Sequence, residues 1–130
     1  MPTILYAEDD PDQHLLVRIS LKGHEFRLIE ARDGQEALTK IKSAPPDLIL
    51  LDLFMPFMDG FGVMKAVKAD PHTEHIPIVV LSAWPTGDNR MRARKNGADD
   101  FLAKPYNPAH LVRVIKKHLP AKESSRPLPG

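Results

Sequence analysis

Five short apolar segments alternate with segments that have the period of an α-helix along this 130-residue chain. The segment LILLDL, residues 48–53, is apolar on both faces, which is typical of a central strand in a buried parallel sheet. Regular alternation of strands and helices predicts a doubly wound α/β fold, a five-stranded parallel sheet with helices on both faces. The predicted strands are residues 3–7, 26–31, 48–53, 78–82 and 101–103.

Helix signals follow each predicted strand. Asp10 and Pro11 are a good N-cap and a good first helical residue, and the first helical pattern covers residues 14–22. The residues that this helix is expected to bury are Leu15, Leu16 and Ile19. The other predicted helices follow Asp33-Gly34 and Gly60, and cover residues 86–96 and 108–119.

Composition limits the classes of protein that this chain can represent. Hydrophobic residues make up 42% of the chain, enough for one packed core. The absence of cysteine excludes a disulfide scaffold and a thiolate metal site. The net charge of +1 argues against direct nucleic-acid binding, and no apolar run is long enough to span a membrane. We therefore expect a small cytoplasmic domain over residues 1–119, with residues 120–130 as a flexible tail or the start of a linker.

Polar residues stand at the ends of four of the five predicted strands. In sheets of this class, ligands bind beyond the carboxyl ends of the strands. The strand-end residues are Glu8, Asp9, Asp52, Ser82 and Lys104. Each of them alone is more often an ordinary turn or surface residue, but their joint occurrence favours a functional site.

The chemistry of these side chains predicts a phosphoryl-transfer site that contains Mg2+. Three neighbouring carboxylates repel one another, and a hard divalent cation relieves that repulsion. The hydroxyl of Ser82 and the ammonium of Lys104 suit the oxygens of a phosphoryl group. Asp52, among apolar residues of the central strand, is then the expected nucleophile that forms an acyl phosphate. The nearby Asp10 and Asp12 are better explained as a helix cap and a solvated turn.

Four stretches of the chain resemble the receiver domain of bacterial two-component response regulators. They are ILYAEDDPD, PDLILLDLFMPFMDG, PIVVLSA and GADDFLAKPY, and the resemblance covers residues 3–119. It implies a flavodoxin-like sheet with strand order 2-1-3-4-5, in a single-domain protein similar to chemotaxis receivers.

The resemblance also implies a role for each strand-end residue. Asp52 is the implied phosphoacceptor, and Ser82 and Lys104 are the residues that contact the phosphoryl group. The bond between Lys104 and Pro105 is expected to be cis. The implied Mg2+ ligands are Glu8, Asp9, Asp52 and the backbone carbonyl of Phe54.

Partners and a switch follow from the same resemblance. A histidine kinase or a histidine phosphotransfer protein is the expected phosphoryl donor. Phe101 resembles the aromatic residue that turns inward when Ser82 moves toward the phosphate. In the family, this movement changes the surface that the fourth helix, fifth strand and fifth helix offer to a downstream protein. Such a protein is a signalling switch that catalyses only its own phosphorylation and slow dephosphorylation. Homodimerisation on this surface is left open, because Val114 stands where an arginine is often found.

Two other functions fit the sequence less well. An FMN carrier needs a phosphate-binding loop after the first strand, where this chain has acidic residues that repel phosphate. A Mg2+-dependent phosphohydrolase needs a second carboxylate two residues after Asp52, where this chain has Phe54. Histidines 72 and 75 could bind a metal, but they lie in a loop at the other edge of the sheet.

Two further features point to properties of this particular chain. Phe54 and Trp84 are bulky residues expected beside the path of water to a phosphorylated Asp52, which predicts a slowly hydrolysed phosphoryl group. The fourth helix carries four basic residues, Arg90, Arg92, Arg94 and Lys95, which form either a solvated face or a partner surface.

Overall fold

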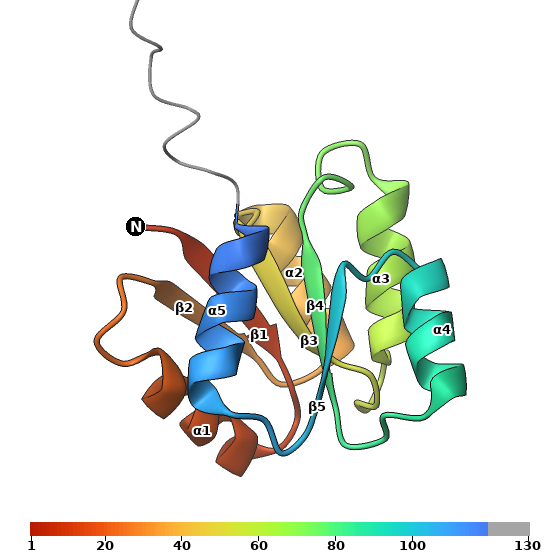
Figure 1. Ribbon diagram of the computed structural model, residues 1–130. Helices are drawn as coiled ribbons and strands as arrows, with labels where there is room; N and C mark the ends of the chain where they lie inside the picture. The colour runs from red at the N-terminus through yellow and green to blue at the C-terminus, as the bar shows by residue number, and fades with distance from the viewer. Residues whose placement is uncertain (120–130) are drawn as a thin grey trace, which may run out of the picture.

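The computed structural model describes residues 1–119, and these residues form a five-stranded parallel sheet in the order β2-β1-β3-β4-β5 (Figure 1). The predicted fold class and strand order are therefore confirmed. The predicted tail, residues 120–130, lies outside the described residues. The strands are β1 (Thr3–Ala7), β2 (Arg27–Ala31), β3 (Leu48–Asp52), β4 (Ile78–Ser82) and β5 (Asp100–Ala103).

A helix follows each strand, and the helices cover both faces of the sheet. Apolar residues of α1 and α5 pack on one face, and those of α2, α3 and α4 pack on the other (Figure 1). The helices are α1 (Pro11–Leu21), α2 (Gly34–Ser43), α3 (Gly60–Ala69), α4 (Gly87–Lys95) and α5 (Pro108–His118). Among these described elements, none combines the length and the apolar character that a membrane span requires.

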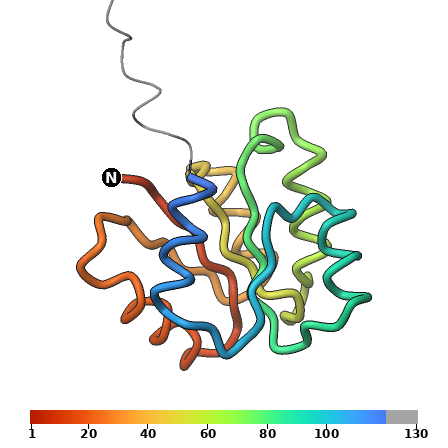
Figure 2. The backbone as a smooth tube through the Cα atoms, viewed as in Figure 1, coloured from red at the N-terminus to blue at the C-terminus, as the bar shows by residue number. Residues whose placement is uncertain are grey.

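The central strands are buried throughout, as the apolar run in β3 predicts. All five residues of β3 and all five of β4 are buried. Each helix begins with a polar N-cap whose side chain accepts a backbone N–H bond. The N-caps are Asp10, Asp33, Asp59, Thr86 and Asn107. Because every helix begins where a strand has just ended, the loops after β1, β3, β4 and β5 gather at one end of the sheet (Figure 2).

The predicted buried face of the first helix is wrong. Leu15, Leu16 and Ile19 are 50%, 49% and 59% exposed, and α1 instead buries His14, Val17 and Leu21. The buried residues are separated by three and four positions, which places them on one helical face. His14 takes the inward position because its ring packs against Tyr6 and its Nε2 bonds the Glu8 carbonyl, which turns Leu15, Leu16 and Ile19 outward.

Candidate functional site

Three carboxylates from two neighbouring strands meet at the carboxyl end of the sheet. Glu8 and Asp9 follow β1, and Asp52 ends β3, which pairs with β1. One oxygen from each of the three side chains lies within 4.8 Å of the others. Glu8 and Asp52 are buried, whereas Asp9 is exposed. The structure therefore brings together the three acids that the sequence predicts as metal ligands.

Lys104, just after β5, reaches across to these carboxylates. Its Nζ forms an ion pair with Glu8 Oε1 and donates to Asp52 Oδ1 at 3.3 Å. Its backbone N–H donates to the carbonyl of Ser82 at 2.8 Å, which joins the ends of β4 and β5. The bond between Lys104 and Pro105 is cis, as expected. Lys104 therefore belongs to the same cluster as the three acids.

Ser82 ends β4 next to Asp52 and is fully buried. Its Oγ accepts the backbone N–H of Trp84 at 3.0 Å. The structure thus places the predicted hydroxyl at the same edge of the sheet, in contact with the loop that leads into α4.

Burial changes the acidity of Asp52. It raises the pKa of Asp52 to about 6, and the negative charge of Glu8 adds to this rise, while the ammonium of Lys104 opposes it. A carboxylate with a raised pKa gains from any cation that stabilises its charged form. The site therefore favours the binding of a positive ion beside Asp52.

The donor set fits Mg2+. Three carboxylates and one ammonium leave a net charge of −2 at this point, and carboxylate oxygens are the ligands that Mg2+ prefers. The site opens into a pocket of about 300 Å³, at whose rim lie Phe54 and Trp84. A phosphoryl group fits in a space of this size beside the carboxylates and Lys104.

Asp10 and His72 make local contacts outside the acidic cluster. Asp10 caps α1 by accepting the backbone N–H of Asp12 at 2.9 Å, as predicted. His72 contacts Asp70 at 3.3 Å within its own turn. Among residues 1–119, the group that can hold a metal ion consists of Glu8, Asp9 and Asp52.

The sequence interpretation missed two residues that support the site. The hydroxyl of Tyr6 lies 3.4 Å from Glu8 Oε1, and Nε2 of His14 lies 2.6 Å from the Glu8 carbonyl oxygen. His14 stands three positions before Val17, so helical spacing gave a signal for its inward orientation. The inward orientation of Tyr6 follows from its position in a strand that is buried on both faces.

The predicted switch residue lies at the opposite side of β4 from Asp52. Phe101 is half-buried on β5 and packs against the core beneath α4. The guanidinium of Arg90 lies 4.6 Å from the centre of its ring. The side chain of Phe101 is therefore held between the sheet and α4.

The fold and the site together define a class: flavodoxin-like α/β proteins with an acidic pocket centred on a buried aspartate at the end of the third strand. The chain belongs to the response regulator receiver domain family of two-component signalling, whose sequence profile matches residues 4–116. The family is a signalling domain, which is consistent with a switch and differs from the two alternative functions that the sequence left open.

Comparisons with individual proteins agree with this assignment. The chain is 36% identical over 117 residues to response regulator GtcR of Aneurinibacillus migulanus. The aligned residues cover 90% of this chain and 47% of that protein. It spans about half the length of the curated relatives it matches first.

The structural similarity to known receiver domains is equally broad. Chemotaxis response regulator CheY4 of Vibrio cholerae superposes with a TM-score of 0.85 at 30% identity, over 92% of this chain and 99% of that one. The receiver domain of sensor histidine kinase PA1611 from Pseudomonas aeruginosa, solved with a magnesium ion in its active site cleft, gives a TM-score of 0.84 at 27% identity, over 90% and 96%.

Proposed function

We propose that this chain accepts a phosphoryl group on Asp52 in a Mg2+-dependent reaction and thereby changes its partner-binding surface. The observation that carries this proposal is the convergence of Asp52 with Glu8, Asp9 and Lys104 at one end of the sheet. No single strand supplies this group, so its assembly depends on the fold as a whole.

In the proposed reaction, a carboxylate oxygen of Asp52 attacks the phosphorus of a phosphohistidine. The O–P bond forms as the P–N bond breaks, and the leaving imidazole takes up a proton. The ammonium of Lys104 and the hydroxyl of Ser82 stabilise the charge on the transferring oxygens. Bound Mg2+ supplies further neutralisation of this charge. Its proposed ligands are Glu8, Asp9, Asp52 and the backbone carbonyl of Phe54.

The proposed output surface consists of α4, β5 and α5. Four cations on α4 support a role in binding an acidic partner, because among residues 1–119 none of them lies at ion-pair distance from a carboxylate. The two acids beside the α4–β5 groove are already engaged. Asp99 accepts the Ile78 N–H at 2.9 Å, and Asp100 contacts His118 at 2.9 Å. Arg90 and Arg94 line this groove beside Phe101.

The proposed partners are a histidine kinase or histidine phosphotransfer protein as donor and a downstream protein as receiver of the signal. We place this exchange in the cytoplasm. The chain acts in it as a switch that catalyses its own phosphorylation and slow dephosphorylation, with residues 1–119 as the receiver domain.

Phosphorylation with a small-molecule donor tests the proposal without knowledge of the kinase. Wild-type protein incubated with acetyl phosphate and Mg2+ is expected to gain one phosphoryl group by intact-protein mass spectrometry, and Asp52→Asn is expected to gain none. Asp12→Asn, which changes an exposed acid of α1, is the matched control and retains phosphorylation. Equal phosphorylation of Asp52→Asn and wild type refutes Asp52 as the acceptor.

A further inference from the structure

A buried histidine lies directly behind the proposed metal-binding loop. His14, on the first turn of α1, is 4% exposed, and its Nε2 lies 2.6 Å from the carbonyl oxygen of Glu8. A carbonyl can only accept, so Nε2 donates this hydrogen bond. The ring also packs against Tyr6, with ring centres 4.8 Å apart. His14 is therefore fixed in place by both packing and hydrogen bonding.

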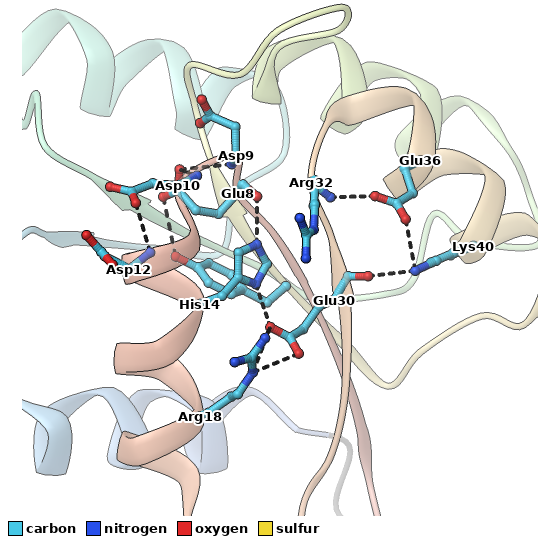
Figure 3. Close-up of polar contacts among 11 residues, drawn as sticks. Glu8, Asp9, Asp10, Asp12, His14, Arg18, Glu30, Arg32, Glu36 and Lys40 are labelled. Atoms are coloured by element: carbon cyan, nitrogen blue, oxygen red, sulfur yellow. Dashed lines mark hydrogen bonds and ion pairs between the residues drawn. The ribbon is translucent and has the colours of Figure 1, made fainter.

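The second ring nitrogen of His14 is directed to the next strand. Nδ1 lies 2.8 Å from Oε1 of Glu30, which is on β2 (Figure 3). Glu30 is held in turn by Arg18, whose Nε lies 2.9 Å from Oε2 and whose Nη2 lies 2.8 Å from Oε1. Burial opposes ionisation of Glu30, but the hydrogen bonds and charge of Arg18 outweigh it and lower the pKa of Glu30 below its ordinary value. The ring is thus hydrogen-bonded at Nε2, whereas Nδ1 lies close to the Glu30 carboxylate without forming a hydrogen bond among the described residues.

Glu8 is held through both its side chain and its main chain. Glu8 Oε2 accepts the backbone N–H groups of Asp9 and Asp10 at 3.1 and 3.3 Å, and Oε1 accepts from Lys104. His14 holds the main chain of Glu8 from the opposite side (Figure 3). Without this donor, the buried carbonyl would lose a partner, and the main chain that carries two proposed ligands would lose an anchor.

We propose that His14 is a positioning residue for Mg2+, which holds the loop carrying Glu8 and Asp9 in the conformation that binds the cation. This inference rests on the proposed assignment of Glu8 and Asp9 as ligands. Phosphoryl transfer itself does not require His14. Its imidazole ring instead connects α1, β1 and β2 to the metal-binding loop. Groups behind metal ligands commonly change metal affinity by about 10- to 100-fold when they are removed.

The test measures Mg2+ affinity separately from stability. The Kd for Mg2+ is obtained from the fluorescence of Trp84, the chain's single tryptophan, which lies at the rim of the site, and by calorimetry. His14→Phe keeps the ring volume and removes both nitrogens, and we expect it to raise the Kd about tenfold. His14→Gln retains a donor at the length of Nε2 and is expected to restore most of the affinity.

A stability-matched control separates positioning from folding. Val17→Ala removes buried volume on the same face of α1, so it lowers the melting temperature, but it leaves the Kd unchanged. Wild-type affinity in His14→Phe overturns the inference. If His14→Phe does not fold, His14→Ala, which also removes the Nε2 donor, replaces it, and a Kd equal to that of wild type overturns the inference instead.

The same titration distinguishes this inference from the proposed function. Loss of Mg2+ binding in Asp9→Asn supports the ligand assignment whatever His14 does. Wild-type Kd values in both Asp9→Asn and Asp52→Asn refute that assignment, and the inference about His14 then fails with it. Weak binding in Asp9→Asn together with unchanged binding in His14→Phe refutes only the inference.

Discussion

Burying the charged carboxylate of Asp52 costs free energy, although the proposed function requires that charged form. The carboxylate lies at the end of a fully buried strand, beside Glu8 and Lys104. Its ionised form is the proposed nucleophile, yet burial favours the protonated form. Lys104 offsets part of this penalty in the metal-free protein. A bound cation offsets the rest, so the charged state and the metal-bound state stabilise each other.

This conflict predicts a pH-dependent difference between wild type and Asp52→Asn without metal. The pKa of Asp52 is raised from 3.8 to about 6 in the folded protein, so its contribution to stability is full below about pH 4 and is lost as the pH rises through 6. We therefore expect Asp52→Asn to be more stable than wild type at pH 7.5, by about 1–2 kcal/mol after solvent screening, and equally stable near pH 4. Urea unfolding in EDTA at several pH values measures this difference.

The control for this experiment is Asp12→Asn, which makes the same change of acid to amide at an exposed position and so reports effects of the substitution other than burial. A wild-type protein as stable as Asp52→Asn at pH 7.5 contradicts the prediction. It would mean that Lys104 alone neutralises the buried charge.

Phe54 and Trp84 predict a slow loss of the phosphoryl group. Both rings stand at the rim of the pocket that contains Asp52, and neither orients a water molecule through a carboxylate or amide. Phe54→Asn supplies one hydrogen-bonding group, and we expect it to shorten the phosphoryl half-life about tenfold, equivalent to one hydrogen bond of ~1.4 kcal/mol in the transition state. Decay of the phosphorylated protein, followed by mass spectrometry after removal of acetyl phosphate, gives the half-life.

A matched control lies in the same loop. Phe57 is 84% exposed and has a φ of 69°, a conformation that asparagine tolerates well. Phe57→Asn therefore makes the same chemical change without strain and outside the pocket, and its half-life is expected to equal that of wild type. Equal half-lives in both variants reject a role for Phe54 in excluding water.

Among the secondary-structure elements, α4 is anchored in an unusual way. Ala93 is its one buried residue. Two arginines supply further contacts by lying over aromatic rings: Arg90 over Phe101 at 4.6 Å and Arg92 over Phe61 at 3.8 Å. Such contacts contribute about 0.5–1 kcal/mol each at exposed sites, less than a buried aliphatic side chain provides. The helix beside the proposed switch residue is therefore held loosely.

Hydrogen exchange tests this weak anchoring. We expect the amides of α4 to exchange faster than those of α3, which buries five residues. Arg92→Ala is expected to increase exchange in α4 about fivefold, since it removes a contact worth about 1 kcal/mol, and to leave α3 unchanged. Arg94→Ala, without an aromatic partner in the described chain, serves as the control and has no effect. Protection of α4 equal to that of α3 contradicts the argument.

The elements also show what sequence patterns can and cannot predict. Period, caps and strand ends predicted every strand and helix to within a few residues, because short-range rules determine them. The buried face of α1 was not predictable from hydrophobicity, since His14 faces inward and Leu15, Leu16 and Ile19 do not. Likewise, nothing in the spacing of Arg90 and Arg92 predicts the rings they cover. Contacts of this kind depend on tertiary placement.

At the scale of the whole molecule, the strand order explains the position of the site. Consecutive strands β1 and β2 lie to one side, and the chain then crosses to β3 on the other side of β1. Loops after β1 and β3 therefore diverge to opposite faces of the sheet and leave an opening between them, which is where Glu8 and Asp52 meet. The proposed switch lies further out, at the edge strand β5, where movement disturbs fewer core contacts.

The whole fold should respond to Mg2+, because the cation binds groups that only the folded chain brings together. At free Mg2+ of 100 times the Kd, linkage predicts about 2.7 kcal/mol of stabilisation, or a rise of about 8 °C in melting temperature for a domain of this size. Thermal unfolding in EDTA and in MgCl2, with NaCl added to equal ionic strength, separates specific binding from charge screening. Asp9→Asn removes a proposed ligand at an exposed position without disturbing the core, so we expect it to fold normally and to lose most of the rise. If Asp9→Asn and wild type gain equally from Mg2+, the stabilising ion binds elsewhere on the protein.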